Sequence, residues 1–292
     1  MCSPYKELIM GKYYTNLDFH QTFKPEKNCL CNLLMALPEC DEKTVQEISK
    51  VTGIPTGKSS GKVVPSIWYL TYMGLIQSSL SDSKYKFQYT ELGNKIMEED
   101  PGIMEELTLL LMHCMLTRMH SGAELWSFII NTMLPMHNGK VRKDTAEKEI
   151  ELRYGKKVNV SPFNGTYVGL FSQLNLISLT DEGYLQNKHL FNEEFIYLYG
   201  LVLYEYWDEW IQGMEESEKV KNKVSNTEIT AAQLWETKFR YPFGWSEQEE
   251  YYTLEKLHDK GIITLNRQMV PFVLRKAMTK EEVVAELYSE LC

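Results

Sequence analysis

The chain has 292 residues, of which 40 are acidic and 31 are basic, so its formal net charge is −9. Its apolar fraction of 43% argues against a disordered chain, and no apolar run reaches the roughly 18 residues of a membrane span, so we expect no membrane contact. The negative charge excludes a protein that coats nucleic acid without specificity, so a role on DNA would need a local basic face.

The first residues and the cysteines indicate where in the cell the protein acts. The start, MCSPYKE, lacks the basic region followed by an apolar one that forms a secretory signal. The six cysteines are scattered along the chain, which suits reduced thiols. We therefore expect a cytoplasmic protein.

Three turn signals divide the chain: Asp100-Pro101-Gly102, Asn138-Gly139, and the segment 213–227, which has almost no large apolar residue. At roughly 100 to 150 residues per domain, two or three units are expected. We predict an N-terminal extension (1–18), a winged helix-turn-helix (19–100), a helical connector (101–139), a second winged-helix-like unit with a long helix (140–212), a linker (213–227) and a C-terminal winged-helix-like unit (228–292).

The first unit shows the expected elements most fully. We predict helices over 29–37, 44–51 and about 60–73, strands over 75–80 and 85–89, and a further short helix from Thr90. Thr44 followed by Glu47 has the spacing of a capping box, and Gly53 ends that helix. Pro65 lacks an N–H and fits within the first helical turn, so the regular third helix should begin near Gly61 or Lys62.

A short pattern recurs three times, over 72–76, 173–177 and 259–263. Its central residue is Gly74, Asn175 or Gly261, which suits a left-handed helix C-cap, and an apolar pair follows that would begin a strand. Apolar residues seven and four positions earlier form one helix stripe in each copy; these are Ile67 and Leu70, Val168 and Phe171, and Leu254 and Leu257. The third helix of a winged helix-turn-helix leads into its wing in this way. The same order also arises by chance in many α+β proteins.

The later elements follow the same plan. In the second unit we predict helices over 145–154 and 161–174 and a wing turn at 180–184; in the third, helices over 230–238 and 247–260, with Ser246 as the cap, and a hairpin over 262–274. Apolar helices over 103–119, 123–133 and 191–211 would pack between the units. The predicted fold class is mainly α with small β-wings, as tandem winged helix-turn-helix units joined by packing helices.

The segment 57–62, GKSSGK, is the strongest candidate binding site. It is not a nucleotide phosphate loop, because three residues rather than four separate Gly53 from Gly57-Lys58, and a helix rather than a strand precedes it. At the start of a recognition helix, its unpaired N–H groups and lysines would favour phosphate. The predicted DNA contacts here are Lys58, Ser59, Ser60, Lys62 and Ser66. The alternative is a solvated turn in a winged helix that binds protein.

Further cations and aromatics extend this site. Lys84 and Lys86 alternate on the first wing and could contact phosphates, but lysines on an edge strand also prevent aggregation. Secondary DNA contacts could come from His20, Arg240, Arg267, Arg275 and Lys276, which lie in or near aromatic clusters. Such aromatics could stack on a base, although we favour packing between units.

No residue pattern requires chemistry. Cys29 and Cys31 are two apart on a helix and lack the repeated spacing of a zinc site, and His113, Cys114 and His120 suit an apolar core or interface. The paired carboxylates suit solvated faces, and no nucleophile elbow occurs. We therefore expect no metal, no cofactor and no catalysis.

The run Phe19-His20-Gln21-Thr22-Phe23, with Gly57-Lys58 in a later turn, resembles a prokaryotic family with an N-terminal His-Glu-Thr-Phe-like motif. In this chain Gln21 replaces the usual Glu. Genes of that family lie beside phosphoadenosine-phosphosulfate-reductase-like genes in DNA sulfur-modification and phage-defence loci. The resemblance implies a DNA-associated accessory or regulatory subunit in a bacterial antiviral defence operon, and it supplies no catalytic residue.

Two functions follow as hypotheses. The first is an accessory or regulatory protein that binds double-stranded DNA by sequence or structure. The second is a non-catalytic scaffold whose winged helices bind a protein encoded in the same operon. Either could form a homo-oligomer.

Overall fold

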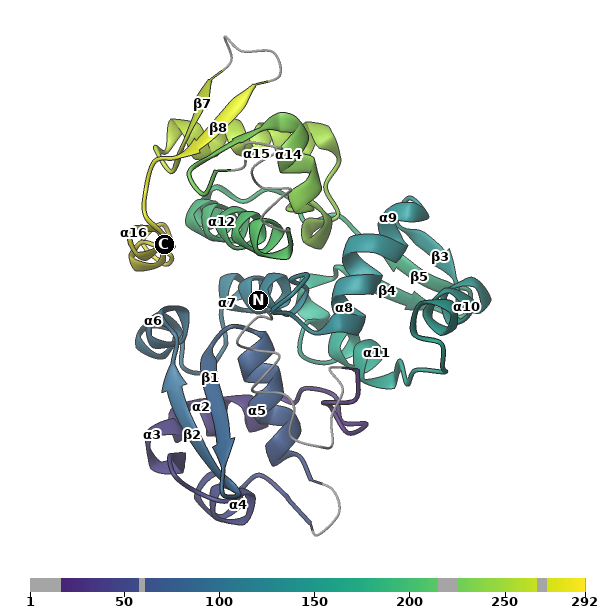
Figure 1. The fold of residues 1–292 in the computed structure, drawn as a ribbon, viewed down its shortest axis with the longest axis vertical. Helices are drawn as coiled ribbons and strands as arrows, with labels where there is room; N and C mark the ends of the chain where they lie inside the picture. Colours follow the sequence, from purple (N-terminus) through teal and green to yellow (C-terminus); the bar gives the residue numbers. More distant parts are fainter. Residues whose placement is uncertain (1–16, 58–60, 215–224, 267–271, 292) are drawn as a thin grey trace.

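Two apolar helices lie at the centre of the molecule, α7 (Glu106–Leu116) and α12 (Ile196–Gly213) (Figure 1). Every residue of α7 after Glu106 is buried, and so is most of α12. The structure is a computed structural model that describes residues 17–57, 61–214, 225–266 and 272–291. It is mainly helical with small antiparallel sheets, as the sequence predicts. None of the helices in these ranges is long and apolar enough to cross a membrane.

The first lobe contains α2 (Lys27–Met35), α3 (Leu37–Cys40), α4 (Val45–Thr52), α5 (Val63–Tyr72), β1 (Ile76–Ser81), β2 (Lys84–Tyr89) and α6 (Glu91–Glu99). The predicted capping box is confirmed, since the Thr44 hydroxyl accepts from the Glu47 N–H and the Glu47 carboxylate accepts from the Thr44 N–H. Lys62 is the N-cap of α5, which places Pro65 in the first turn as expected. The elements follow the predicted order except for α3, a short separate helix that begins where the predicted helix over 29–37 ends.

The hairpin of this lobe is joined to the start of α4. Asp82 and Ser83 both have positive φ, 50° and 63°, which is typical of the tight turns that match the strand twist. The Tyr85 N–H donates to the Lys43 carbonyl at 2.8 Å, and the Phe87 N–H donates to the Asp41 carboxylate at 2.9 Å. The tip of the hairpin therefore lies beside the N-terminus of α4.

The second lobe contains α8 (Glu124–Phe128), a π-helical turn (Ile129–Met133), α9 (Leu134–Met136), β3 (Lys140–Arg142), α10 (Lys143–Tyr154), α11 (Ser161–Val168), a 3₁₀ turn (Ser172–Leu174), β4 (Ile177–Thr180) and β5 (Gly183–Gln186). Its sheet has the order β3-β5-β4. The predicted continuous helix over 161–174 is wrong, because the backbone leaves the helical region at Gly169, with ψ −101°. Val168 is consequently 63% exposed instead of facing the core.

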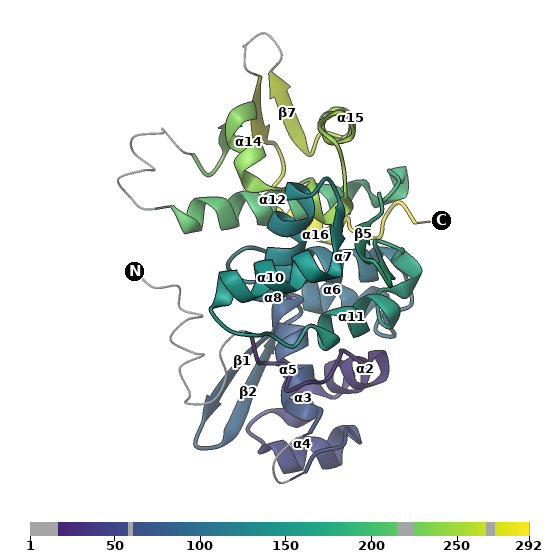
Figure 2. The same cartoon turned by 90° about the vertical axis from the view of Figure 1, so that its right-hand side faces the viewer.

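A 3₁₀ turn (Glu193–Phe195) leads into α12, and the third lobe follows α12 in the chain. It contains β6 (Glu228–Thr230), α14 (Ala231–Thr237), a 3₁₀ turn (Tyr241–Phe243), α15 (Glu247–Asp259), β7 (Ile263–Asn266), β8 (Val273–Lys276) and α16 (Lys280–Ala285). Its sheet has the order β6-β8-β7. Ser246 caps α15 as predicted, with Glu249 completing a capping box. Figure 2 shows the first and third lobes at opposite ends of the molecule.

The left-handed cap predicted by the repeat is confirmed in all three copies. The φ angles of Gly74, Asn175 and Gly261 are 74°, 47° and 81°. In the first and third copies the next N–H donates to the carbonyl five residues back at 2.9 Å, which is the Schellman arrangement. The second copy ends in a 3₁₀ turn instead. The first and third copies are therefore the closer pair.

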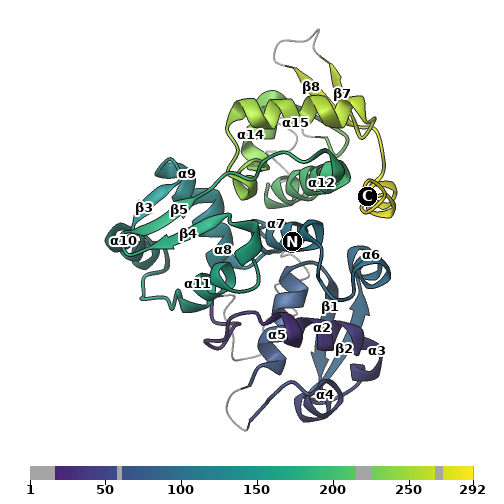
Figure 3. The same ribbon diagram turned by 180° about the vertical axis from the view of Figure 1, so that it is seen from behind.

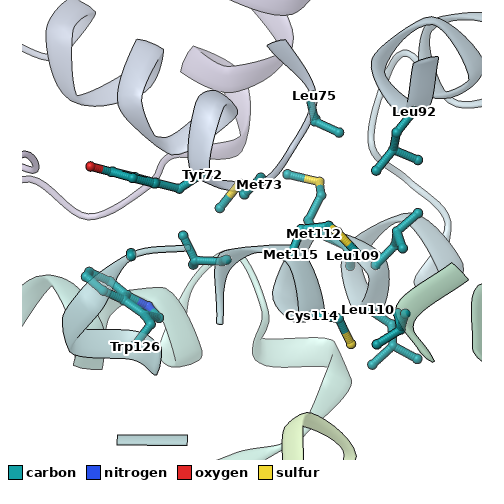
Figure 4. Close-up of a cluster of buried hydrophobic side chains, with 14 of the residues drawn as sticks. Tyr72, Met73, Leu75, Leu92, Leu109, Leu110, Met112, Cys114, Met115 and Trp126 are labelled. Atoms are coloured by element: carbon teal, nitrogen blue, oxygen red, sulfur yellow. The ribbon is translucent and has the colours of Figure 1, made fainter. Parts of the chain in front are cut away.

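The first lobe is joined to α7 by apolar contact (Figure 4). Met73 and Leu75, which follow α5, lie over the side chains of Met112 and Met115, while the ring of Tyr72, the last residue of α5, points to one side of them. All five residues are at most 4% exposed. On the other side of the body, α16 lies beside α6 and α12 (Figure 3). The lobes therefore share one continuous core.

Candidate functional site

The residues predicted to contact DNA lie in several different parts of the structure. Lys58, Ser59, Ser60 and Arg267 lie outside the described residues. The others lie at the start of α5, on the hairpin, in the core and at the base of the third lobe.

The two residues predicted within α5 have internal partners. The Lys62 ammonium lies 2.7 and 2.8 Å from the Glu26 carboxylate oxygens, and this hydrogen bond raises the pKa of Lys62. Ser66 is 4% exposed, and its hydroxyl donates to the Lys62 carbonyl at 2.7 Å. The Ser66 side chain is therefore not available for a contact with DNA in this conformation, which corrects the sequence-based assignment.

Helix α5 presents a narrow and uncharged outer face. Seven of its ten residues are buried against the rest of the molecule. The partly exposed ones are Val64, Trp68 and Thr71, which recur at helical spacing on one side. A recognition helix that reads a groove along its length would expose a wider polar face.

The two lysines of the hairpin are accessible to solvent. Lys84 and Lys86 are both exposed on β2. Lys86 forms an ion pair with Glu42 at 3.2 Å, in which both side chains are more than 60% exposed, so water can readily replace it. Lys84 is close enough to Glu47 to help lower its pKa, after the larger effect of the Thr44 hydrogen bonds. These lysines flank the start of α4.

His20 belongs to the core. It is 2% exposed, and its Nδ1 accepts from the Thr22 N–H at 3.1 Å. Phe19 and Trp126 surround the ring at centroid distances of 5.4 and 6.2 Å. Burial lowers the pKa of His20, which favours the neutral ring. The predicted DNA contact by His20 is therefore corrected to an aromatic packing role.

The described cations predicted as secondary contacts in the third unit all form ion pairs with carboxylates. Arg240 is 16% exposed and forms ion pairs with Glu250 at 3.2 Å and Glu247 at 3.5 Å. Lys276 is also 16% exposed and pairs with Asp208 at 2.6 Å. Arg275 pairs with Glu228, but its side chain is 68% exposed. Of these three, only Arg275 stays accessible to a ligand.

A cleft that the sequence analysis missed lies between the first lobe and the central helices. Its volume is about 600 Å³, which is within the range of small-molecule sites. One wall comes from α5 and β1, with Trp68, Tyr72 and Gln77, and the facing wall comes from α12 and the end of α7. The facing wall contributes these residues: Met115, Arg118, His120, Ser121, Leu201, Glu205, Asp208, Glu209 and Gln212. Lys280 and Val284 of α16 close one end.

Ion pairs organise the floor of this cleft. Arg118 Nη1 donates to Glu205 at 2.5 Å, and Lys280 bridges Glu205 at 2.9 Å and Asp208 at 3.0 Å. Lys276 continues the chain to Asp208. The network ties the end of α7 to α12, β8 and α16, so it fixes the position of every charged group in it.

Burial and pairing oppose each other within this network. Burial alone would raise the pKa of Glu205, but Arg118 and Lys280 outweigh it and lower that pKa. Burial would likewise lower the pKa of Lys280, yet Glu205 and Asp208 raise it. Arg118, Glu205 and Lys280 therefore stay charged near neutral pH.

Glu209 has a different partner set. It is 3% exposed and accepts from the backbone N–H groups of His120, at 2.5 Å, and Ser121, at 3.1 Å. These bonds fix the turn after α7. Glu205, Asp208 and Glu209 share one face of α12, and charged residues within so apolar a helix were the sequence signal for this site.

The described residues contain no group of three or more His, Cys, Asp and Glu side chains placed to hold a metal ion. Cys29, Cys31, Cys40 and Cys114 are buried free thiols, and burial raises the pKa of each. The cleft itself combines a floor of paired charges with an aromatic wall.

Comparisons with known proteins show similarity at the level of fold. No protein-family model and no curated protein sequence matches the chain. Two solved structures are similar, described as "Magnesium ion-bound SspB crystal structure" and "SspB crystal structure", with TM-scores of 0.65 and 0.61. Their sequences are 13% and 14% identical to this one, and each match covers 95% of this chain and 89% of the other. The chain therefore shares the architecture of these SspB structures over nearly its whole length.

Proposed function

We propose that the chain is an accessory or regulatory protein that binds double-stranded DNA by sequence or structure, without catalysis of its own. The observation that carries this proposal is the order of helices and hairpin in the first lobe, with Lys84 and Lys86 exposed beside the start of α4. We interpret α2, α4, α5 and the hairpin as a winged helix-turn-helix. In that interpretation the hairpin lysines contact phosphates across the wing.

The proposed contact surface is narrower than the sequence suggested. Since most of α5 is buried, the DNA would contact the wing and the segment before α5, including Lys58, instead of the length of the helix. The resemblance to a family from DNA sulfur-modification and phage-defence loci supports a place in a prokaryotic defence operon. One of the similar SspB structures has magnesium bound, which makes the ion a useful variable in the test.

Charge reversal on the wing tests the proposal. Lys84→Glu with Lys86→Glu should weaken duplex binding by about tenfold or more at 0.1 M salt and lower the salt-dependence slope by about 2, because two phosphate contacts are lost. The measurement is fluorescence anisotropy with labelled duplexes at several salt concentrations. The matched control is Lys148→Glu with Lys157→Glu, which reverses two exposed lysines of the second lobe.

Equal affinities of the wing variant and its control would contradict the proposed surface. Binding should also leave supercoiled plasmid intact in the presence of Mg²⁺, as judged on an agarose gel. Strand cleavage that tracks with the purified protein would contradict the non-catalytic part of the proposal.

A second candidate function is a scaffold that binds a protein of the same operon. It is favoured by Trp235 of α14, which is 49% exposed and lines an apolar groove with Tyr251 and Phe272. Trp235→Glu should then abolish a complex with an operon partner, measured by size-exclusion chromatography with light scattering, while Trp68→Glu serves as a comparison in the first lobe. A complex that survives Trp235→Glu would exclude this groove as the interface.

A further inference from the structure

The cleft between the first lobe and the central helices has a wall suited to a flat ligand. Trp68 and Tyr72 lie one helical turn apart on α5, and their rings stack at 5.7 Å with an interplanar angle of 25°. Both line the cleft, and Trp68 is only partly buried. An aromatic platform of this kind accepts the π-face of a planar heterocycle.

The opposite wall offers fixed hydrogen-bonding groups. The Arg118 side chain is 11% exposed and is held by the Met115 carbonyl at 3.2 Å and by Glu205. Its Nη2 faces the stretch after α5, since a Cβ on Gly74 would lie 3.5 Å from it. The rim adds the exposed carboxamides of Gln77 and Gln212, each of which can both donate and accept.

The charge balance of the cleft restricts the class of ligand. Two cations of the lining, Arg118 and Lys280, pair with two of its carboxylates, Glu205 and Asp208. Glu209 adds a third carboxylate, held by backbone N–H groups, and the exposed Glu91 adds a fourth. The cleft lining thus has two cations and four carboxylates, so it has no surplus positive charge to attract a polyphosphate, whereas a neutral ring with donors and acceptors on its edge fits.

We propose that this cleft binds a nucleobase, with its face against Trp68 and its edge against Arg118 and Gln77. The cleft volume of about 600 Å³ admits a nucleoside but not a duplex. The base could come from a free nucleoside or from an unpaired position in a DNA strand, and the same chemistry would recognise both. The inference is independent of Lys84 and Lys86, which lie toward the tip of the hairpin, whereas Gln77 lies near its base.

The experiment uses the full chain and two kinds of probe. The first is each of the four deoxynucleosides at up to about 1 mM, measured by isothermal titration calorimetry, a range that detects weak small-ligand binding. The second is a single-stranded oligonucleotide with 2-aminopurine, whose fluorescence reports insertion between aromatic rings. Binding of the nucleosides indicates a free ligand, and binding of the oligonucleotide alone indicates a base within DNA.

Trp68→Ala should weaken binding of the responding probe by about tenfold or more, because stacking on an aromatic ring is lost. Trp235→Ala, at the exposed tryptophan of the third lobe, should stay within about twofold of the native chain. Gln77→Ala should weaken binding less than Trp68→Ala, and Lys84→Glu with Lys86→Glu should leave nucleoside binding unchanged. This last variant separates failure of the cleft from failure of the DNA proposal.

If the Trp68→Ala variant does not fold, amide hydrogen exchange on the native chain still locates the binding site. The responding probe should slow amide exchange in 68–78 and 118–121. No binding of any probe, equal loss in Trp68→Ala and Trp235→Ala, or protection confined to other segments would overturn the proposal.

Discussion

Replacing Trp126 with alanine should lower the free energy of unfolding by about 3–5 kcal/mol, the typical cost of removing a large buried aromatic side chain. Trp126 is 0% exposed in α8 of the second lobe. Its ring packs against three other aromatic rings, with centroid distances of 5.8 Å to Phe19, 6.0 Å to Tyr69 and 5.8 Å to Phe163. It therefore joins the aromatic cluster of the first lobe to the core of the second, and alanine would leave a cavity between them.

The indole N–H of Trp126 has no hydrogen-bond partner among the described residues, so the loss should come from packing alone. Trp126→Phe should then retain most of the stability, because it keeps an aromatic ring and removes an unpaired donor. Trp235→Ala, at a half-exposed position, should cost less than about 1 kcal/mol. Guanidinium denaturation followed by circular dichroism measures all three. A cost below about 1 kcal/mol for Trp126→Ala would contradict the assigned role.

Local signals in the sequence predicted local structure well. The capping box at Thr44, the cap at Ser246 and the left-handed turns at Gly74 and Gly261 depend on neighbours within a few residues, and all are confirmed. The break at Gly169 was missed, because the apolar spacing through Phe171 continued across it. Spacing reports which residues could share a face, but it does not report whether the backbone stays helical.

Contacts between distant segments could not be predicted in the same way. The chain of ion pairs at the cleft joins residues from Arg118 to Lys280, and its members lie in the turn after α7 and in three later elements, α12, β8 and α16. His20 was a candidate contact because aromatics in its cluster could stack on a base, yet in the fold Phe19 and Trp126 surround it. The candidate site was missed because its polar groups meet only in the folded chain.

Acidification should destabilise the fold between pH 6.5 and about 4 through two buried histidines. His113 is 0% exposed, and its Nε2 lies 3.0 Å from the Pro242 carbonyl, which can only accept, so Nε2 carries the proton. The Tyr167 hydroxyl then donates to Nδ1 at 3.1 Å. A second ring proton would point at that hydroxyl in an apolar site, and burial lowers the pKa of His113 to about 4.

His189 has a similar environment in the adjoining core. The Tyr199 hydroxyl accepts from the Asn192 N–H at 3.0 Å, so it can donate its own proton to His189 Nε2, 2.9 Å away. Burial lowers the pKa of His189 to about 4 as well. Glu250 acts in the opposite direction, because burial raises its pKa to about 7 despite its ion pair with Arg240. The stability curve of the native chain therefore combines two opposed contributions.

A variant isolates the histidine contribution. Since the pKa of His113 in the unfolded chain is 6.5 and the folded value is about 4, the neutral ring stabilises the fold fully above pH 6.5. That stability is lost as the pH falls through 6.5 to 4, by roughly 3 kcal/mol per histidine. His113→Gln cannot take up this proton. The amount by which its free energy of unfolding falls below that of the native chain should therefore shrink by roughly 3 kcal/mol between pH 7.5 and 4.

A non-titrating neighbour provides the matched control for this shrinking deficit. Phe171 is 0% exposed, and its ring centroid lies 5.7 Å from that of His113. Phe171→Leu therefore perturbs the same core without removing a titratable group. Its deficit should stay constant with pH, because the variant and the native chain then bind the same number of protons in both states. Urea denaturation of both variants from pH 4 to 7.5 gives the two curves. Parallel curves for the two variants would show that folding does not lower the pKa of His113, and the network with Pro242 and Tyr167 would then have to accommodate an imidazolium at low pH.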